Sequence, residues 1–471
     1  MHLLGHSRSD TSLATRRHAS RVQRRHRSGI APAAERLLAG LAGGHLSRLP
    51  VNVRFWDGTV LNGGVGRRDQ DAPVVVVGER RAVSHLLHES NQLGLARGWV
   101  DGSLRVEGDL EQLLNTRNLF QDVHLSPRDR VRLALEAARL TGPGVLRRPP
   151  IPAIEASLNG ERHSITRDRQ AVRHHYDVSN DFYRLILGPS MVYSCAYFTD
   201  ADDSLDEAQA RKLDLICRKL RLAEGERLLD IGCGWGSLLL HAAANYNVRA
   251  VGVTLSEPQA ELARARARQH GLGDRIEVRV ADYRECSDGP FDKIASVGMY
   301  EHVGRNELAG YVGQVTRLLR PGGLFLNHGI VRLDSEPPTS DTFISRYIFP
   351  DGELHPVTEV MVAMRAAGLE VRDVEALREH YPLTLRRWLA NLRANRDRAI
   401  AIVGAERERT WQLYLLVSAL GFESGDISVY QVLATRHGGP HQLPLDRSEL
   451  LRGVEAATAD LPPRRRPSYQ S

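Results

Sequence analysis

The chain has 471 residues, of which 42% are hydrophobic and 25% charged, and its formal net charge is +6. These numbers fit a globular protein of two or three domains, and no apolar run approaches the ~20 residues that a membrane-spanning helix needs. The N-terminus lacks the apolar segment of a signal peptide, and the four cysteines follow neither a disulfide nor a zinc spacing, so we expect a cytoplasmic protein without a structural metal.

The N-terminal part predicts an arm followed by a small domain. Residues 1–33 are rich in Arg, His and Ser and show no apolar periodicity, which indicates a disordered basic arm that is solvated or touches anionic lipid. Residues 34–125 predict a small α/β domain with strands at 51–56 and 74–77. Nothing in it has catalytic spacing, so a structural role and a lipid-binding or dimerising role both remain open.

A linker is expected at 126–165, where Pro and Gly residues interrupt a short helical pattern. From 166 to 440 strands and helices alternate, which predicts a Rossmann-like α/β domain with a parallel sheet covered on both faces. Residues 441–471 are expected to be a C-terminal tail. The predicted strands of the larger domain are 228–231, 248–255, 276–281, 291–297 and 324–331, with helices at 257–270 and 307–319 among the segments between them.

A glycine-rich turn follows the first of these strands. Its sequence, Asp-Ile-Gly-Cys-Gly-Trp-Gly at 230–236, has the spacing G-x-G-x-G and not the G-x-G-x-x-G of dinucleotide-binding proteins. Glycines let a ligand approach the backbone closely, and the N-terminus of the helix that follows offers free N–H groups. The turn therefore predicts a nucleoside-cofactor site, and it is similar to motif I of methyltransferases that use S-adenosylmethionine (SAM).

Taken together, several sequence blocks resemble the cyclopropane-fatty-acyl-phospholipid synthase family, whose members use SAM to modify unsaturated lipid chains. The resemblance implies a Rossmann-like class I SAM methyltransferase domain with a smaller N-terminal α/β domain. It also implies methylene transfer to the cis double bond of an unsaturated phospholipid acyl chain, giving a cyclopropane fatty acid. The blocks that carry it are 175–183, 191–198, 229–236, 252–256 with Gln259, 296–304, 346–350 and 411–436.

The ends of the strands and the resemblance together give a set of expected SAM contacts. The glycines of the turn face the methionine part, the turn after the second strand is assigned to the cofactor, and the residues after the third strand border the adenine. Ser256 has the alternative role of an N-cap for the helix at 257. The expected cofactor-binding residues are Tyr193, Ser194, Asp230, Gly232, Gly234, Thr254, Leu255, Ser256, Gln259, Asp282 and Tyr283.

The implied reaction leaves a carbocation on the lipid, and a base must then remove a proton from the new methyl group. The resemblance implies that this base is a bound bicarbonate ion. In that arrangement the N–H groups of Cys195 and Ile330, the His328 ring and the Tyr381 hydroxyl donate to the anion, and Glu301 accepts from its hydroxyl. Aromatic faces can stabilise the cation, and the candidates are Tyr300, Phe343 and Tyr347, each of which could instead be ordinary core.

Two amphipathic helices expected at 383–404 and 409–420 carry Trp388, Trp411 and Tyr414 among their apolar positions, and in the family such helices help enclose the acyl chain. A bilayer substrate requires peripheral membrane contact, which basic and exposed apolar residues can provide. The resemblance does not fix the oligomeric state, and a homodimer is one alternative.

Three other functions are alternatives to cyclopropane formation. Methylation of the same alkene with proton loss elsewhere gives a methylene branch, which a reductase could turn into a methyl branch, and because it uses the same sites this alternative remains open. A nucleic-acid partner is not expected, since the chain lacks the acidic-Pro-Pro-aromatic tetrad of amino methylation and a base-reading module. The intact glycine turn and the five-residue anion set argue against a noncatalytic lipid carrier.

Overall fold

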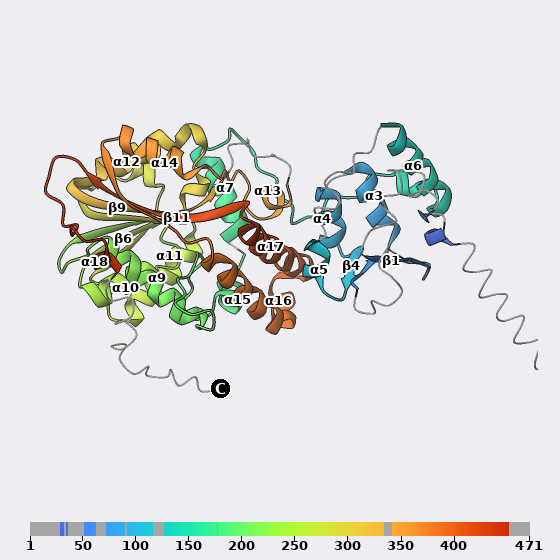
Figure 1. Ribbon diagram of the computed structural model, residues 1–471, viewed down its shortest axis with the longest axis horizontal. Coiled ribbons are helices and arrows are strands. Elements are labelled where there is room, and N and C mark those ends of the chain that lie inside the picture. The colour runs from blue at the N-terminus through green and yellow to red at the C-terminus, as the bar shows by residue number, and fades with distance from the viewer. Residues whose placement is uncertain are drawn as a thin grey trace, which may run out of the picture. The chain divides into compact units, whose positions relative to one another are not determined.

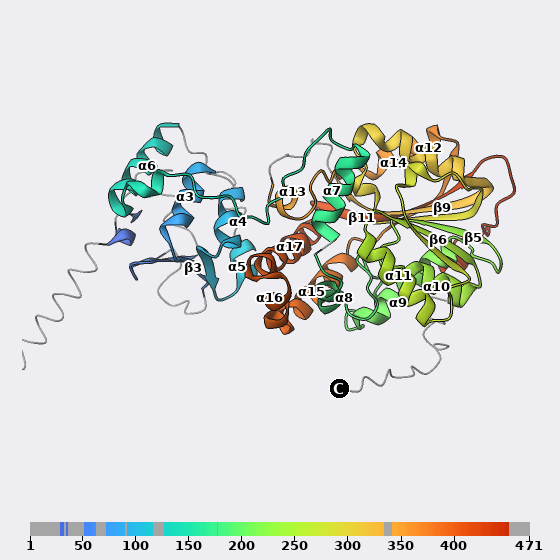
Figure 2. The same ribbon diagram turned by 180° about the vertical axis from the view of Figure 1, so that it is seen from behind.

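The computed structural model describes residues 29–32, 34–35, 51–62, 72–89, 92–115, 127–176, 178–333 and 342–451. It divides into two compact units, residues 1–155 and residues 156–471 (Figures 1 and 2). The boundary falls inside the segment predicted as a linker. Most of the expected basic arm and the last twenty residues of the expected tail lie outside the described residues. No helix within the described ranges is long and apolar enough to cross a membrane.

The first unit contains a four-stranded sheet with the order β2-β1-β3-β4, in which β1 and β3 are parallel and the other pairs antiparallel. The strands predicted at 51–56 and 74–77 are confirmed as β1 and β3. The elements are β1 (Asn52–Phe55), β2 (Val60–Leu61), β3 (Val74–Val77), α3 (Arg80–His88), α4 (Gln92–Val100), β4 (Leu104–Glu107), α5 (Leu110–Asn115), α6 (Pro127–Thr141) and the 3-10 helix η3 (Pro143–Leu146).

The second unit is built on a seven-stranded sheet with the order β10-β11-β9-β8-β5-β6-β7. Strands β9, β8, β5, β6 and β7 are parallel neighbours, and β11 runs antiparallel to β9 and β10. All five strands predicted for this domain are confirmed. The bounds are β5 (Arg227–Ile231), β6 (Arg249–Thr254), β7 (Ile276–Val280), β8 (Phe291–Val297), β9 (Leu319–Arg332), β10 (Leu369–Ala376) and β11 (Ile427–Arg436).

Helices cover both faces of this sheet, as the alternation of strands and helices predicts (Figures 1 and 2). Successive residues of β5 enter opposite cores: Leu228 packs in the cluster that contains residues of α9, α10 and α11, and Leu229 in the cluster that contains residues of α12 and α14. The helices on the two faces are α9 (Leu205–Lys219), α10 (Ser237–Tyr246), α11 (Glu257–Gln269), α12 (Leu308–Leu318) and α14 (Val357–Ala366).

The remaining elements of the second unit precede the sheet, connect its strands or follow it. They are α7 (Ile165–Tyr176), α8 (Asn180–Leu187), η4 (Tyr283–Glu285), η5 (Tyr300–His302), η6 (Arg305–Glu307), α13 (Phe343–Tyr347), α15 (His380–Ala394), α16 (Arg396–Val403), α17 (Ala405–Ser424) and α18 (Ser448–Leu451).

The structure differs from two predictions for the C-terminal region. The single helix expected at 383–404 is two helices, because α15 ends before Asn395 and α16 begins after it, and Gly404 at φ +81° then separates α16 from α17. The residues after 440, expected to be a tail, include α18, whose Leu450 is buried against the second unit. Nearby, Arg447 forms an ion pair with Asp373.

Candidate functional site

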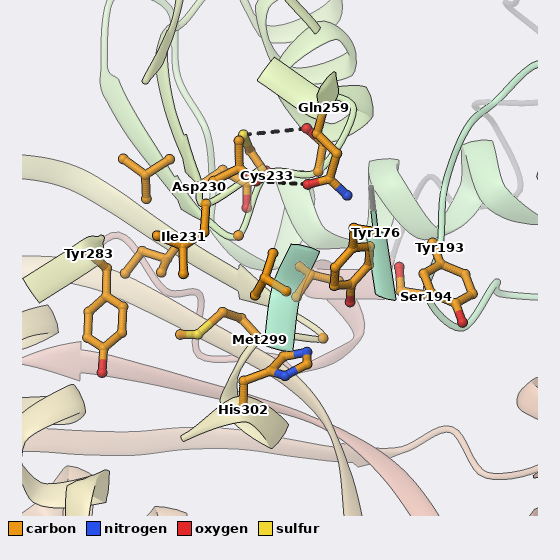
Figure 3. Close-up of a pocket in the computed structure, with 18 of the residues that line it drawn as sticks. Tyr176, Tyr193, Ser194, Asp230, Ile231, Cys233, Gln259, Tyr283, Met299 and His302 are labelled. Carbon is orange, nitrogen blue, oxygen red and sulfur yellow. Dashed lines mark hydrogen bonds between the residues drawn. The ribbon is translucent and has the colours of Figure 1, made fainter. Parts of the chain in front are cut away.

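A pocket lies where the carboxyl ends of β5, β6, β7 and β8 meet, which is where open α/β sheets bind ligands (Figure 3). Residues from the turns after these four strands line it, together with residues of α7 and of the segment before α9. Tyr283 and the pair Tyr193 and Ser194 lie at opposite ends of the pocket in Figure 3. Every expected cofactor contact except Ser256 is among the lining residues.

Ser256 has the alternative role that the sequence left open. Its hydroxyl accepts a hydrogen bond from the backbone N–H of Gln259 at 3.4 Å, so it is the N-cap of α11. The side chain of Gln259 does line the pocket, and its Oε1 accepts from the Thr254 hydroxyl at 2.8 Å, which Figure 3 marks. The carbonyl end of this amide is therefore held by the protein, and its NH₂ group can donate to a ligand.

The glycine turn adopts a backbone that requires glycine. Gly232, Gly234 and Gly236 have φ angles of +83°, +52° and +78°, which L side chains rarely adopt. A Cβ atom at Gly232 would also lie 3.1 Å from both Cβ and Cγ of Met299, another residue of the pocket wall. The turn thus keeps side chains out of the space beside Asp230 and leads directly into the N-terminus of α10.

The residues expected to border the adenine are held by a residue that the sequence did not single out. Arg284 donates from Nε to Asp282 Oδ1 at 2.8 Å and from one terminal nitrogen to Asp282 Oδ2 at 2.7 Å. It also donates to Asp168 Oδ2 of α7 at 2.7 Å and to the carbonyl of His163 at 3.1 Å. The Asp282 carboxylate is therefore engaged by Arg284, and Arg284 ties α7 to this end of the pocket.

At the other end, Ser194 is held from helix α9. Its hydroxyl accepts from Lys212 Nζ at 2.7 Å, and its carbonyl accepts from Gln209 Nε2 at 2.9 Å. The neighbouring Tyr193 hydroxyl lies 3.2 Å from His175 Nε2 and donates to the Tyr414 hydroxyl at 2.9 Å. Tyr193 also stacks against His175, so its ring is fixed where it borders the pocket.

The residues that line this pocket do not include any of the five that were expected to hold an anion. They contact one another in part: Glu301 Oε1 accepts from the backbone N–H of Ile330 at 2.7 Å. That N–H was expected to donate to the anion, and in the structure it donates to Glu301 instead. Complete burial raises the pKa of Tyr381, so its hydroxyl keeps its proton and can donate.

His328 and Glu301 each have a buried polar atom that finds no hydrogen-bond partner among the residues that the structure describes. Burial holds the pKa of His328 well below its usual value, so the ring is neutral, and Gln431 Nε2 lies 3.2 Å from Nδ1 across the β9–β11 ladder. With the amide nitrogen donating there, the ring proton is on Nε2, and this atom has no partner. Glu301 Oε2 has none either, and burial raises the pKa of Glu301 to about 7. When Glu301 is ionised, a donor and an acceptor are therefore left unsatisfied within the described part of the chain.

The thiol of Cys195 is protonated, because complete burial raises its pKa. The expected role of Cys195 through its backbone N–H needs no thiolate and is compatible with this state.

The three aromatic candidates for stabilising a cation are core residues. Tyr300 is 1% exposed and donates to the His355 carbonyl at 3.2 Å, and its ring occupies the place where a Cβ of Gly329 would be. Phe343 and Tyr347 are buried and face each other on α13. None of the three lines the described pocket, whereas Tyr176, Tyr193, Trp235 and Tyr283 do.

Four further residues that line the pocket were not predicted from the sequence: His163, Asp168, Lys212 and Arg284. His163, Asp168 and Arg284 come to the site through contacts between distant parts of the chain, which no local sequence pattern encodes. Lys212 had a usable signal, because it is one of only three lysines in the chain and immediately precedes the apolar residues of α9 that face the core.

The family model described as Mycolic acid cyclopropane synthetase matches residues 163–432. A probable fatty acid methyltransferase of Pseudomonas putida is 39% identical over 412 residues, which cover 86% of this chain and 97% of that protein. The cyclopropane-fatty-acyl-phospholipid synthase of Escherichia coli (strain K12) is 38% identical over 264 residues, which cover 56% of this chain and 67% of the synthase.

Among solved structures, the mycolic acid cyclopropane synthase CmaA1 complexed with SAH and CTAB matches with a TM-score of 0.54 and 37% identity. The match covers 57% of this chain and 98% of CmaA1.

Proposed function

The chain belongs to the mycolic acid cyclopropane synthetase family of SAM-dependent methyltransferases, and from this membership we propose a specific reaction. In it, a methylene group passes from SAM to the cis double bond of an unsaturated phospholipid acyl chain and closes a cyclopropane ring. Bicarbonate would act as the base, held by Cys195, Glu301, His328 and Tyr381, while the Ile330 N–H holds Glu301 in place.

The pocket at the strand ends supports the placement of SAM. The glycine turn leaves room for the methionine part beside Asp230, the Gln259 amide has its NH₂ group available, and Tyr283 offers a ring at the opposite end. SAM supplies the electrophilic methyl group when it is bound. The task of the chain is to hold the alkene against that methyl group and to exclude water, since an isolated alkene is a weak nucleophile.

One observation carries the proposed base: the unpartnered buried atoms His328 Nε2 and Glu301 Oε2. Bicarbonate has oxygens that accept and one hydroxyl that donates, so it matches a donor and an acceptor together. His328 would donate to it and Glu301 would accept from its hydroxyl. Glu301 itself is fixed by the Ile330 N–H, which lies two residues beyond His328 on β9. When bound, bicarbonate would supply the base that removes a proton from the transferred methyl group.

Peripheral membrane contact is part of the proposal, because the substrate lies in a bilayer. Helix α6 of the first unit supports it with two exposed apolar residues one turn apart, Val131 at 61% and Leu135 at 54% exposure. Exposed Arg128, Arg132 and Arg139 occupy the adjacent stripe of the helix. Apolar residues beside arginines fit the interface of an anionic membrane. Whether the first unit also forms a homodimer stays a prediction.

A second candidate function is methylation of the same alkene to give a methylene or methyl branch. The observation that favours it is the Pseudomonas putida relative, which matches along 86% of this chain and is named a probable fatty acid methyltransferase. The two reactions share the cofactor and the methyl transfer, and they differ in the fate of the cation. Loss of a methyl proton with ring closure gives the cyclopropane, whereas a 1,2-hydride shift before the loss of a methyl proton gives a methylene branch, which a separate reductase with its own reductant would convert to a methyl branch.

Proton NMR distinguishes the two products, which have the same mass. Purified full-length protein is incubated with SAM, bicarbonate and vesicles of a cis-monounsaturated phospholipid, and the lipid is extracted. High-field cyclopropane signals are the expected result. Vinylidene signals would establish branch formation in its place, and unchanged lipid would contradict both proposals. Omitting SAM is the matched control.

A further inference from the structure

Lys212 is a buried cation in the wall of the cofactor pocket that the proposed mechanism does not use. It is 1% exposed and donates to the neutral hydroxyl of Ser194. The chain has two other lysines, and both have carboxylate partners: Lys219 pairs with Asp373 and Glu375, and Lys293 with Glu226. Among the described residues, no carboxylate oxygen lies within the 4.0 Å that defines such a pair for Lys212.

The hydrogen bond to Ser194 places Lys212 between the cofactor pocket, which both residues line, and the anion set, to which the neighbouring Cys195 belongs. Burial lowers the pKa of Lys212 to about 8, against the opposing effect of Asp230. The charge of Lys212 in turn contributes to the lowered pKa of His328. Asp230, whose own burial raises its pKa to about 7, favours the charged form of Lys212, but the two form no ion pair among the described residues. A buried cation without a counter-charge is unfavourable, so an anion bound beside it would be stabilised.

Helix α9 also fixes the backbone at this place. Gln209, nearly one turn before Lys212, is fully buried and donates to the carbonyl of Ser194. Ser194 lies between Tyr193, which borders the cofactor pocket, and Cys195, which belongs to the proposed anion set. Two buried side chains of one helix thus hold the short segment that both sites share.

We propose that Lys212 is the counter-cation of a carboxylate-type oxyanion bound beside Ser194. Two ligands have this chemistry, namely the methionine carboxylate of SAM and bicarbonate. The inference rests on the proposed positions of SAM and bicarbonate, and it assigns to Lys212 a positioning role for whichever of them it contacts.

The test compares wild type with Lys212→Met, which removes the charge and the hydrogen bond, and Lys212→Gln, which removes the charge and keeps a donor for Ser194. Lys293→Met is the matched control, since it removes another fully buried lysine that does not line the pocket and leaves Arg320 near Glu226. Binding of S-adenosylhomocysteine is measured by calorimetry. Binding of bicarbonate is measured as the rise in unfolding temperature over an equal ionic strength of chloride, at one fixed pH.

Both Lys212 variants are expected to lose about 10- to 100-fold in affinity for one of the two ligands, the range for hydrogen bonds to charged groups. Loss confined to S-adenosylhomocysteine identifies the methionine carboxylate, and loss confined to bicarbonate identifies that ion. Wild-type affinities for both ligands in both Lys212 variants would overturn the proposal. Wild-type affinities in Lys212→Gln alone would also overturn it, since that variant lacks the charge. An equal loss of ligand affinity in Lys293→Met would do the same.

Both measurements are of binding and need no lipid product. A wild-type protein that forms no cyclopropane would therefore refute the proposed function and leave this test intact. If the wild type shows no response to bicarbonate, the S-adenosylhomocysteine measurement alone decides the role of Lys212.

Discussion

Glu301→Gln is expected to stabilise the protein at alkaline pH while it abolishes turnover. The pKa of Glu301 is raised from 4.5 to about 7 by burial, so the folded protein favours the protonated form. The stability that this preference contributes is present below pH 4.5 and is lost as the pH rises through about 7. The difference in pKa corresponds to roughly 3 kcal/mol at about pH 8.

A glutamine at position 301 is neutral at every pH and keeps an oxygen for the Ile330 N–H, which Glu301 accepts at 2.7 Å. The variant should therefore match wild type in unfolding free energy near pH 4.5 and exceed it by up to roughly 3 kcal/mol near pH 8. Urea unfolding of both proteins across this range measures the difference. A difference that does not grow with pH, or a wild type that is more stable at about pH 8, would refute the burial argument.

The same variant tests the proposed role of Glu301. Turnover should fall by at least about 100-fold because a glutamine NH₂ group or oxygen cannot replace the orienting carboxylate. Affinity for S-adenosylhomocysteine should stay unchanged, since Glu301 does not line the pocket. In wild type, turnover should rise with pH through about 7, provided that the bicarbonate concentration is held constant at each pH. Unchanged turnover in the variant would remove Glu301 from the reaction.

Three further predictions concern the pocket and α6. Gly232→Val should abolish S-adenosylhomocysteine binding in calorimetry, because a Cβ there meets Met299 at 3.1 Å in a backbone with φ +83°, and normal binding would contradict the cofactor placement. Arg284→Met should weaken the same binding by about 10-fold through the loss of charged hydrogen bonds to Asp168 and Asp282, and an unchanged affinity would show that this end tolerates their loss. Val131→Asp with Leu135→Asp should reduce co-sedimentation with anionic vesicles, whereas an exposed control such as Val362→Asp in the second unit should not.

The sequence by itself determined the sheet and most of the cofactor pocket. Buried strands have short apolar runs, and the positive φ angles of Gly232 and Gly234 follow from a strand that turns at once into a helix. Because parallel strands present their carboxyl ends at one edge, residues that follow different strands converge there, which is why Thr254 and Tyr283 were placed correctly in one pocket. These features depend on local pattern and on the general geometry of the fold.

Only the tertiary structure decided which polar groups satisfy one another. Arg284 reaches Asp168 across 116 residues, and the Ile330 N–H is taken by Glu301 across 29 residues. Such pairings depend on how helices and strands pack, and periodicity along the chain carries no information about them. Among the described residues, the same packing leaves His328 Nε2 without a hydrogen-bond partner and Lys212 without a carboxylate within ion-pair distance. These residues can be found in the sequence, but their burial without partners is visible only in the folded chain. Because burying unpaired polar groups costs free energy, this arrangement points to bound anions.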